Sequence, residues 1–561
     1  MRIFGHGNGL AVAFLFCFSL LIPALPAWGA QYFVDASTTG EGDGSSDHPF
    51  KTIQRGVDKA QAGDTVIVRK GTYPEQIMVN HGGTAEKPLI IRADPIGSVV
   101  VDGADPLKGF EEDVSHHTTD GTRVWVCNAY HSNYIPMGNS FDLRTDWLKE
   151  GEEGKQQVEL LSRNDMVWLD GRFLDEVDSA DELRFGTFRV DRQKSALYVP
   201  LVAADRPEDH LIETSQRGTL FDCGPQSSFV HVRGFHFTRG GFNGNAVAKI
   251  GSYTTEGWVA EDNVADWGNF SGFKIYGKNN RILRNVAADN GCEGMQGVIH
   301  DTVLDGNSSL RNNWKGIRDT YESGGGKFTE SDHVTVRNHL AAYNKGPGLW
   351  FDINNKNITV EYSRFHDNKY AGLFIEVAPG PTVIRENTSW ANQGGGIVIG
   401  ESSNVVIENN ILAGNVYGID LRNLQGRHGL FGNIDGKPAE TQWQISDITI
   451  RGNVLLKNTR AGIANTSYYL DPVAQRITSD NNVFWDNNIL MWQTPDPKGP
   501  DANVPKPPGI LATMNGFWIF NNMYSKDKFG GLEQHSTWTD PKFVNSNMYE
   551  FQPPKPAPPA Q

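Results

Sequence analysis

Cysteine is scarce in this chain: its 561 residues contain four, and one of them, Cys17, lies in an apolar leader segment. The other three, Cys127, Cys223 and Cys292, show no CxxC spacing and no neighbouring histidines in a ligand pattern. This scarcity argues against a zinc site and allows at most one disulfide. Covalent cross-links therefore do not hold the fold together.

Clusters of positive charge are also missing, because the formal net charge is −15 and no run of Lys and Arg offsets it. This balance argues against a nucleic-acid partner. After the leader, no stretch is apolar for long enough to span a membrane. The leader itself combines Arg2, the apolar run "LAVAFLFCFSLLI" and small residues near Ala30. It predicts a signal peptide over residues 1–30, and hence a soluble secreted or periplasmic protein.

Familiar catalytic motifs are absent too. The chain contains no G-x-S-x-G, P-loop or H-E-x-x-H sequence in a supporting context. Glycine, with 61 residues, and asparagine are abundant instead. Both residue types tolerate positive φ angles and separate short strands, so the composition indicates an all-β chain with many turns.

A repeat organises the second half of the chain. A glycine followed by an apolar-x-apolar strand recurs at intervals of 22, 22, 32, 24, 24 and 22 residues. The segments are "GFKIY" (Gly272), "GMQGV" (Gly294), "GIRDT" (Gly316), "GLWFD" (Gly348), "GLFIE" (Gly372), "GIVIG" (Gly396) and "GIDLR" (Gly418). We attribute the long interval to a loop, "YESGGGKFTES". A second strand recurs between these segments and is followed by Asn or Gly.

Short strands with a period of about 22 residues predict a right-handed parallel β-helix, in which stacked coils share one core. The recurrent asparagines are expected to form amide ladders inside a turn. An amphipathic helix over residues 49–62, with Ile53, Val57 and Ala60 on one face, is expected to cover the open N-terminal end. The predicted divisions are a cap and first coils (31–104), an inserted β-sandwich-like domain (105–217), the main β-helix (218–545, with an insertion at about 424–444) and a Pro-rich disordered tail (546–561).

Two acids occupy equivalent positions in consecutive repeats. In "GLWFD" and "GLFIE", alternation along the strand points Leu349 and Leu373 into the core and leaves Asp352 and Glu376 outside. The acids are one repeat apart, and neighbouring strands lie about 4.8 Å apart. Two carboxylates at about 5 Å raise the pKa of one of them, and this spacing fits a retaining glycosidase with one nucleophile and one proton donor.

The same phase places further side chains on this outer face. Aromatic rings can stack on sugars, and the other residues can hold hydroxyls or carboxylates, while Gly400 leaves room where a ring could sit. The candidate substrate-binding residues are Trp350, Phe374, Arg318, Lys274 and Gln296. Two other interpretations of the acid pair remain open at this point: solvated surface carboxylates, or oxygen ligands of calcium.

The combination of an inserted β-domain with "GLWFD" and "GLFIE" on adjacent coils resembles glycoside hydrolase family 120, the β-xylosidase-like enzymes, within the broad pectate-lyase-like group of exported β-helix proteins. The resemblance covers most of the mature chain. It implies a retaining mechanism without a cofactor, with Asp352 as nucleophile and Glu376 as general acid/base acting on a carbohydrate.

Two other functions fit the same fold. A polysaccharide lyase or uronate epimerase would need a base, such as Lys274 or Arg318, and calcium held by Asp352 and Glu376. Against this alternative, the chain lacks a "DPHD" or "WIDH" sequence. A non-catalytic glycan-binding solenoid would tolerate loss of both acids. The sequence leaves the oligomeric state open.

Overall fold

A computed structural model describes residues 29–116, 118, 120–136, 151–242, 244–423, 444–465, 475–487, 489–493 and 532–541. Nearly all of the predicted signal peptide, the predicted insertion at about 424–444 (apart from residue 444) and the Pro-rich tail lie outside these residues. No helix in the described ranges is long and apolar enough to cross a membrane.

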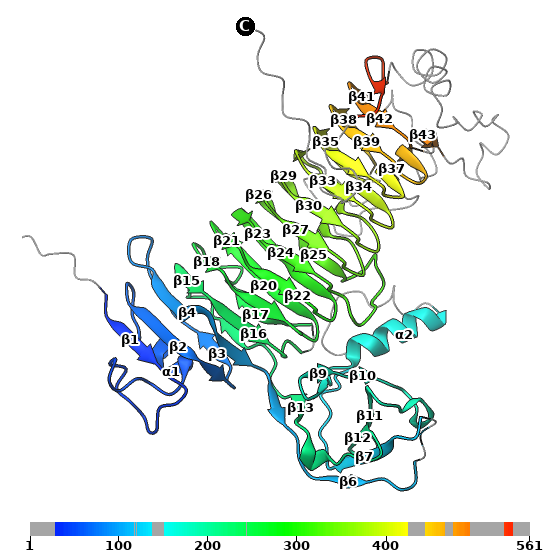
Figure 1. Cartoon of the computed structure of the whole chain (residues 1–561). Helices are drawn as coiled ribbons and strands as arrows, with labels where there is room; N and C mark the ends of the chain where they lie inside the picture. Colours follow the sequence, from blue (N-terminus) through cyan, green and yellow to red (C-terminus); the bar gives the residue numbers. More distant parts are fainter. Residues whose placement is uncertain are drawn as a thin grey trace, which may run out of the picture.

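The predicted solenoid is confirmed over the described coils. The inner coils contribute a strand, or part of a long strand, to each of three ladders, and within each ladder the strands of successive coils pair in parallel. Figure 1 shows the coils stacked along one axis. We refer to the three sets as the first, second and third ladders.

The first ladder carries the candidate site. Its strands are β3 (Ile77–Val79), β14 (Phe221–Cys223), β17 (Ala246–Ile250), β20 (Ser271–Lys278), β23 (Glu293–Asp305), β25 (Gly324–Thr329), β28 (Leu349–Asp352), β31 (Leu373–Glu376), β34 (Gly395–Gly400), β37 (Tyr417–Arg422), β40 (Ala461–Asn465) and β43 (Ile489–Gln493).

The second ladder follows in each coil. Its strands are β1 (Gln31–Val34), β2 (Thr65–Tyr73), β4 (Leu89–Asp102), β15 (Val230–Arg233), β18 (Val259–Glu261), β21 (Arg281–Leu283), the end of β23, β26 (Asp332–Arg337), β29 (Lys356–Glu361), β32 (Thr382–Arg385), β35 (Ser403–Glu408), β38 (Ser446–Arg451) and β41 (Thr478–Asp480).

The third ladder closes each coil. Its strands are the later parts of β2 and β4, then β16 (Phe235–Thr238), β19 (Val264–Asp266), β22 (Val286–Ala288), β24 (Ser308–Leu310), β27 (Leu340–Ala342), β30 (Arg364–His366), β33 (Thr388–Trp390), β36 (Ile411–Ala413), β39 (Val454–Leu456), β42 (Val483–Trp485) and β44 (Thr537–Trp538).

One apolar core runs through the stack, from Val34 to Leu532. The predicted amide ladders are also confirmed. Asn344 donates from its side-chain amide to Oδ1 of Asn368, and Asn368 donates to Oδ1 of Asn392, each over 2.9 Å. We call the following set the asparagine ladder: Asn290, Asn312, Asn344, Asn368, Asn392, Asn415, Asn458 and Asn487. Because these side chains are buried, their mutual hydrogen bonds satisfy groups that water cannot reach.

The N-terminal helix α1 is shorter than predicted and spans Ile53–Lys59. It begins where the Thr52 hydroxyl accepts a hydrogen bond from the Arg55 amide and ends where Ala60 turns extended. As expected, Ile53, Val57 and Ala60 are fully buried, and they join the core beside the first strands. Covering of the open end by this helix stays a prediction.

Two small sheets lie within residues 105–217 and just before them, beside the N-terminal coils (Figure 1). One contains β6 (Phe110–Glu112), β7 (Arg123–Asn128), β10 (Asp175–Glu176), β11 (Thr187–Asp191) and β12 (Ala196–Leu201); the other contains β5 (Ala104–Pro106), β8 (Val167–Leu169), β9 (Arg172–Phe173) and β13 (Ile212–Ser215). Residues of both sheets share one apolar cluster, which includes Trp125 and Leu169. A helix that the sequence analysis missed, α2 (Gly151–Ser162), lies between these sheets and the coils (Figure 1).

The strand predicted at 316–320 is wrong. The chain there is a loop, and the coil after Met295 is completed by β25, in which Gly326 pairs with Met295. Ile317, whose apolar character made "GIRDT" resemble a strand, packs against Leu161 of α2. The extra residues of the 32-residue interval therefore lie before β25. The segment "GGGKFT", predicted to be part of the loop, is this strand.

Candidate active site

Asp352 and Glu376 lie side by side on neighbouring strands, since β28 and β31 pair in parallel with these two residues in register. Leu349, Phe351 and their partners on β31 belong to the main core, as the alternation predicted. Both acids are nearly buried, with exposed fractions of 7% and 4%. They are therefore not the freely solvated surface carboxylates considered above.

The side chains outside the core on the first ladder form a single register column. We call it the outer column: Lys249, Lys274, Gln296, Lys327, Trp350, Phe374, Val398 and Asp420. Its residue type changes at nearly every coil, from cation to amide to aromatic ring to acid. Asp352 and Glu376 lie two residues farther along the same strands as Trp350 and Phe374, and so point to the same side of the sheet.

Trp350 and Phe374 stack on each other instead of presenting open faces. Their ring centroids are 5.2 Å apart at an interplanar angle of 18°. Lys327 lies over the Trp350 ring at 4.2 Å, and Arg422 lies over the Phe374 ring at 4.8 Å. Because β25 and β37 lie beyond opposite ends of this pair, a cation caps the stack at each end. Stacking of these rings on a sugar stays a prediction.

Lys327 is a site residue that the sequence analysis missed. Its ammonium lies 3.2 Å from Oδ2 of Asp352 and 3.0 Å from Oε1 of Glu322. Burial alone would lower the pKa of Lys327, but the charges of Glu322 and Asp352 outweigh burial and raise it. A permanently protonated lysine at this distance favours the ionised form of Asp352.

A second pair of acids lies behind Lys327. Burial raises the pKa of Glu293 well above its ordinary value, and the negative charge of Glu322 adds to this effect. Glu322 behaves in the opposite way: burial would raise its pKa, but Lys327 lowers it. Glu293 is thus held as the neutral acid and Glu322 as the carboxylate, a division of one proton between two close acids.

Gly400 separates Glu376 from Arg422 in the register, and this glycine explains how the arginine reaches the site. A Cβ at this position would lie 3.3 Å from the Phe374 ring, 3.6 Å from Cγ of Glu376 and 3.7 Å from Nε of Arg422. The space beside Gly400 is therefore bordered by Phe374, Glu376 and Arg422, and a sugar ring in it stays a prediction. Burial would lower the pKa of Arg422, but nearby groups, including Asp420 and Glu376, raise it.

The remaining candidates lie farther from the acid pair. Lys274 and Gln296 belong to the outer column but precede Lys327; Lys274 donates to the Gly244 carbonyl, and Gln296 donates to the Ser271 hydroxyl. Arg318 lies off the ladder, in the loop before β25, and its backbone amide donates to Gln157 of α2 over 2.7 Å. The placement expected for Arg318 is wrong, because the segment around it is not a strand.

Metal and disulfide chemistry have little support within the described ranges. No group of three or more His, Cys, Asp or Glu side chains there is arranged to hold a metal ion. Cys127, Cys223 and Cys292 are free thiols.

Comparison with known proteins defines the class. A family model described as "Right handed beta helix region" matches residues 241–412, and one described as "Chondroitinase B" matches residues 48–111. The solved structure of XylC in complex with xylose superposes with a TM-score of 0.58 at 16% identity, covering 83% of this chain and 87% of that one. The chain is a right-handed parallel β-helix protein.

Similarity to curated proteins is confined to short segments. Over 75 residues the chain is 36% identical to the uncharacterized protein YwoF of Bacillus subtilis, which is 13% of this chain and 16% of the relative. Over 90 residues it is 37% identical to pectate lyase PEL9 of Emericella nidulans, which is 16% of this chain and 22% of that protein. The chain thus spans less than a quarter of the length of either relative.

Proposed function

We propose that this chain is an exported retaining glycoside hydrolase, with Asp352 as the nucleophile and Glu376 as the general acid/base. The observation that carries the proposal is the in-register pairing of these two buried acids on neighbouring strands. The strand spacing of about 4.8 Å is close to the 5–5.5 Å that a retaining mechanism requires. The division of roles between the two acids comes from the resemblance to family 120.

The surroundings of Asp352 support its role. A nucleophilic carboxylate must be ionised, and the Lys327 ammonium 3.2 Å from Oδ2 stabilises that form. In the first step Asp352 attacks the anomeric carbon while Glu376 protonates the departing oxygen. In the second step Glu376 takes a proton from water, which then releases the sugar.

A calcium-dependent lyase or epimerase is less well supported. A cation would have to bind Asp352 against the charge of Lys327, and calcium prefers sites built from several oxygen ligands. Lys327 has a raised pKa and is a poor proton acceptor. The two bases considered from the sequence do not reach the acids: Lys274 lies three strands away along the ladder, and Arg318 lies off it.

The test is hydrolysis of aryl glycosides, beginning with a xyloside, with and without a chelator. Glu376→Gln is expected to lower kcat by about 10²–10⁴-fold, and Asp352→Asn by at least as much. Two variants on the second ladder, Glu408→Gln and Asp332→Asn, serve as matched controls and retain full activity. Chelator is expected to have no effect.

Two outcomes contradict the proposal. Unsaturated products that absorb in the ultraviolet, formed from a uronic-acid polymer and lost on chelation, would identify a lyase. Folded Asp352→Asn and Glu376→Gln variants with full activity would leave only glycan binding.

A further inference from the structure

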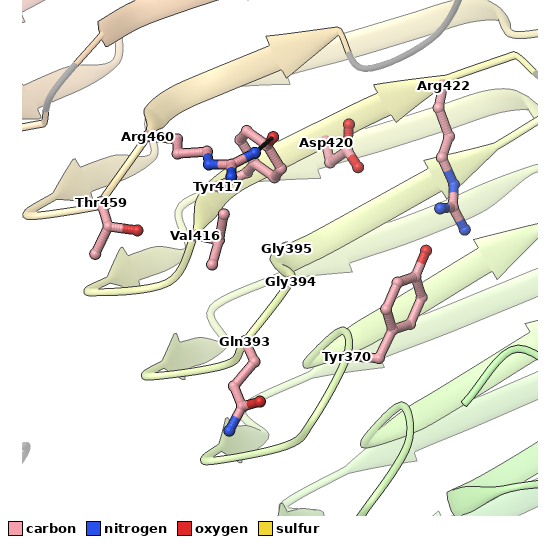
Figure 2. Close-up of a pocket in the computed structure, with 10 residues that line it drawn as sticks. All are labelled: Tyr370, Gln393, Gly394, Gly395, Val416, Tyr417, Asp420, Arg422, Thr459 and Arg460. Carbon is pink, nitrogen blue, oxygen red and sulfur yellow. Dashed lines mark hydrogen bonds between the residues drawn. The ribbon is translucent and has the colours of Figure 1, made fainter. Parts of the chain in front are cut away.

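A cavity of about 570 Å³ opens on the first ladder just beyond Glu376. Figure 2 shows Tyr370 and Arg422 on one side of it and Tyr417 with Arg460 on the other, with the acid of Asp420 between them. Its volume lies within the range of pockets that bind small ligands. Aromatic rings next to an acid and an arginine are suited to sugar rings and hydroxyls.

The register fixes the place of the cavity relative to the acid pair. Arg422 follows Glu376 on the ladder with only Gly400 between them, and Asp420 follows Phe374 with only Val398 between them. The cavity therefore extends from Tyr370, which precedes β31 in the coil of Glu376, to Asp420 and Arg422, which lie two strands or about 10 Å along the ladder. It lies on the side of Glu376 that faces away from Asp352, because β28 and β34 flank β31.

Two polar atoms of the cavity wall are buried without a hydrogen-bond partner in the described part of the chain: the Tyr370 hydroxyl and Nε of Arg422. Burial raises the pKa of the Tyr370 hydroxyl, so it remains a neutral donor. Leaving a buried donor unpaired costs about 1–3 kcal/mol. A hydroxyl-bearing ligand in the cavity would satisfy both atoms.

The charges around the cavity favour a neutral ligand over an acidic one. Arg422 already interacts with the negative charges of Asp420, Glu376 and Glu401. Arg460 is exposed, and it donates to the Tyr417 hydroxyl over 3.1 Å. A ligand carboxylate placed against Arg422 would therefore meet several acids within the same small volume.

We propose that this cavity binds the departing part of the substrate and that this part is a neutral sugar. This inference rests on the proposed function. When Asp352 forms its bond to the anomeric carbon, the bond from that carbon to the leaving oxygen breaks and the proton of Glu376 passes to that oxygen. The departing sugar must then lie on the Glu376 side, where the cavity is.

The reverse step transfers the sugar from Asp352 to a hydroxyl of a neutral sugar bound in the same place, and Glu376 regains its proton.

The experiment measures how the glycosyl group bound to Asp352 divides between water and an added sugar. The full mature chain is given an aryl glycoside donor with increasing xylose or glucose, and transfer product is compared with hydrolysis product. The unmodified enzyme is expected to show saturable transfer. Tyr370→Phe and Asp420→Asn are expected to lower the ratio of transfer to hydrolysis about tenfold, as loss of one hydrogen bond would. Tyr362→Phe and Asp367→Asn, which lie away from the cavity, keep the ratio of the unmodified enzyme.

Several results overturn the inference. One is the absence of saturable transfer to any neutral sugar; another is an unchanged ratio in both cavity variants. Stronger transfer to a uronic acid than to neutral sugars would overturn the ligand class. All three are distinguishable from failure of the proposed function, in which Asp352→Asn and Glu376→Gln retain full hydrolysis of the donor.

Discussion

The asparagine ladder and the outer column both advance by one residue per coil, yet they differ in a way that separates structure from chemistry. The asparagine ladder keeps one residue type through eight consecutive positions, because each amide pairs with the next. The outer column changes type at most coils, from Lys327 to Trp350 and Phe374, then to Val398 and Asp420. A uniform column satisfies the fold, whereas a varied column can place several different groups around one ligand.

Among changes to the two columns, Lys327→Met in the outer column is expected to have the largest effect, a loss of activity. Removing the ammonium leaves two buried carboxylates, Asp352 and Glu322, without the cation that both contact. We expect kcat/KM of the folded enzyme to fall about 100-fold, and the free energy of unfolding to fall by about 3–5 kcal/mol. Lys249→Met is the matched control, since Lys249 lies in the same outer column but pairs with Asp222 at 3.0 Å, away from the acids. Lys327→Arg should restore part of the activity. Equal losses in the Lys327→Met and Lys249→Met variants would show that the outer column is structural.

A smaller effect is expected from Asn368→Ala, which should lower stability without changing the catalytic behaviour of the folded enzyme. The change removes the amide that links Asn344 to Asn392 and leaves buried partners unpaired, at a cost of about 2–3 kcal/mol in the free energy of unfolding. The folded fraction should keep its pH–rate profile. Asn128→Ala, at an exposed position, provides the control. A shifted pH–rate profile in Asn368→Ala would show that the two columns are not separate in function.

The smallest effect concerns Glu293, which is fully buried like the asparagines and yet belongs to the charge network of Lys327. Because its folded pKa is raised, the stability that the neutral acid contributes is present at low pH and is lost as the pH rises above its ordinary value of 4.5. Glu293→Gln removes this loss. We expect the variant to melt about 1–3 °C higher than the parent at pH 8 and no higher at pH 4.

Thermal unfolding followed by circular dichroism at several pH values measures the difference. Glu408→Gln, which alters an acid on the second ladder, should show no such pH dependence. A lower melting temperature for Glu293→Gln at pH 8 would mean that the charged form of Glu293 stabilises the fold.

The regular features were predictable from the sequence. The coil period, the amide ladder and the equivalence of Asp352 and Glu376 follow from spacings that repeat along the chain, and the register confirms that the two acids are neighbours. Their catalytic roles stay a prediction. Lys327 could have been found by aligning "GGKFT" with "GLWFD", which places it at the position of Trp350 in the preceding coil. Arg422 could have been found by extending the position of Glu376 through Gly400.

Other features carried no usable signal. Glu322 comes from an irregular loop, and Ile317 in the same loop imitated a strand because its apolar side chain is buried against α2 and not in the β-helix core. The stacking of Trp350 on Phe374 was also hidden, because alternation gives the direction of a side chain but not what covers its faces.

The sequence by itself determined the stacked coils and the two acids that emerge from adjacent strands, because hydrogen bonding between parallel strands forces equal spacings into equal positions. The tertiary structure alone decided that Glu322, from an irregular loop, meets Lys327 beside those acids, and where a cavity opens next to them. The loop shares no period with the coils, so only the folded chain brings its residues to the site.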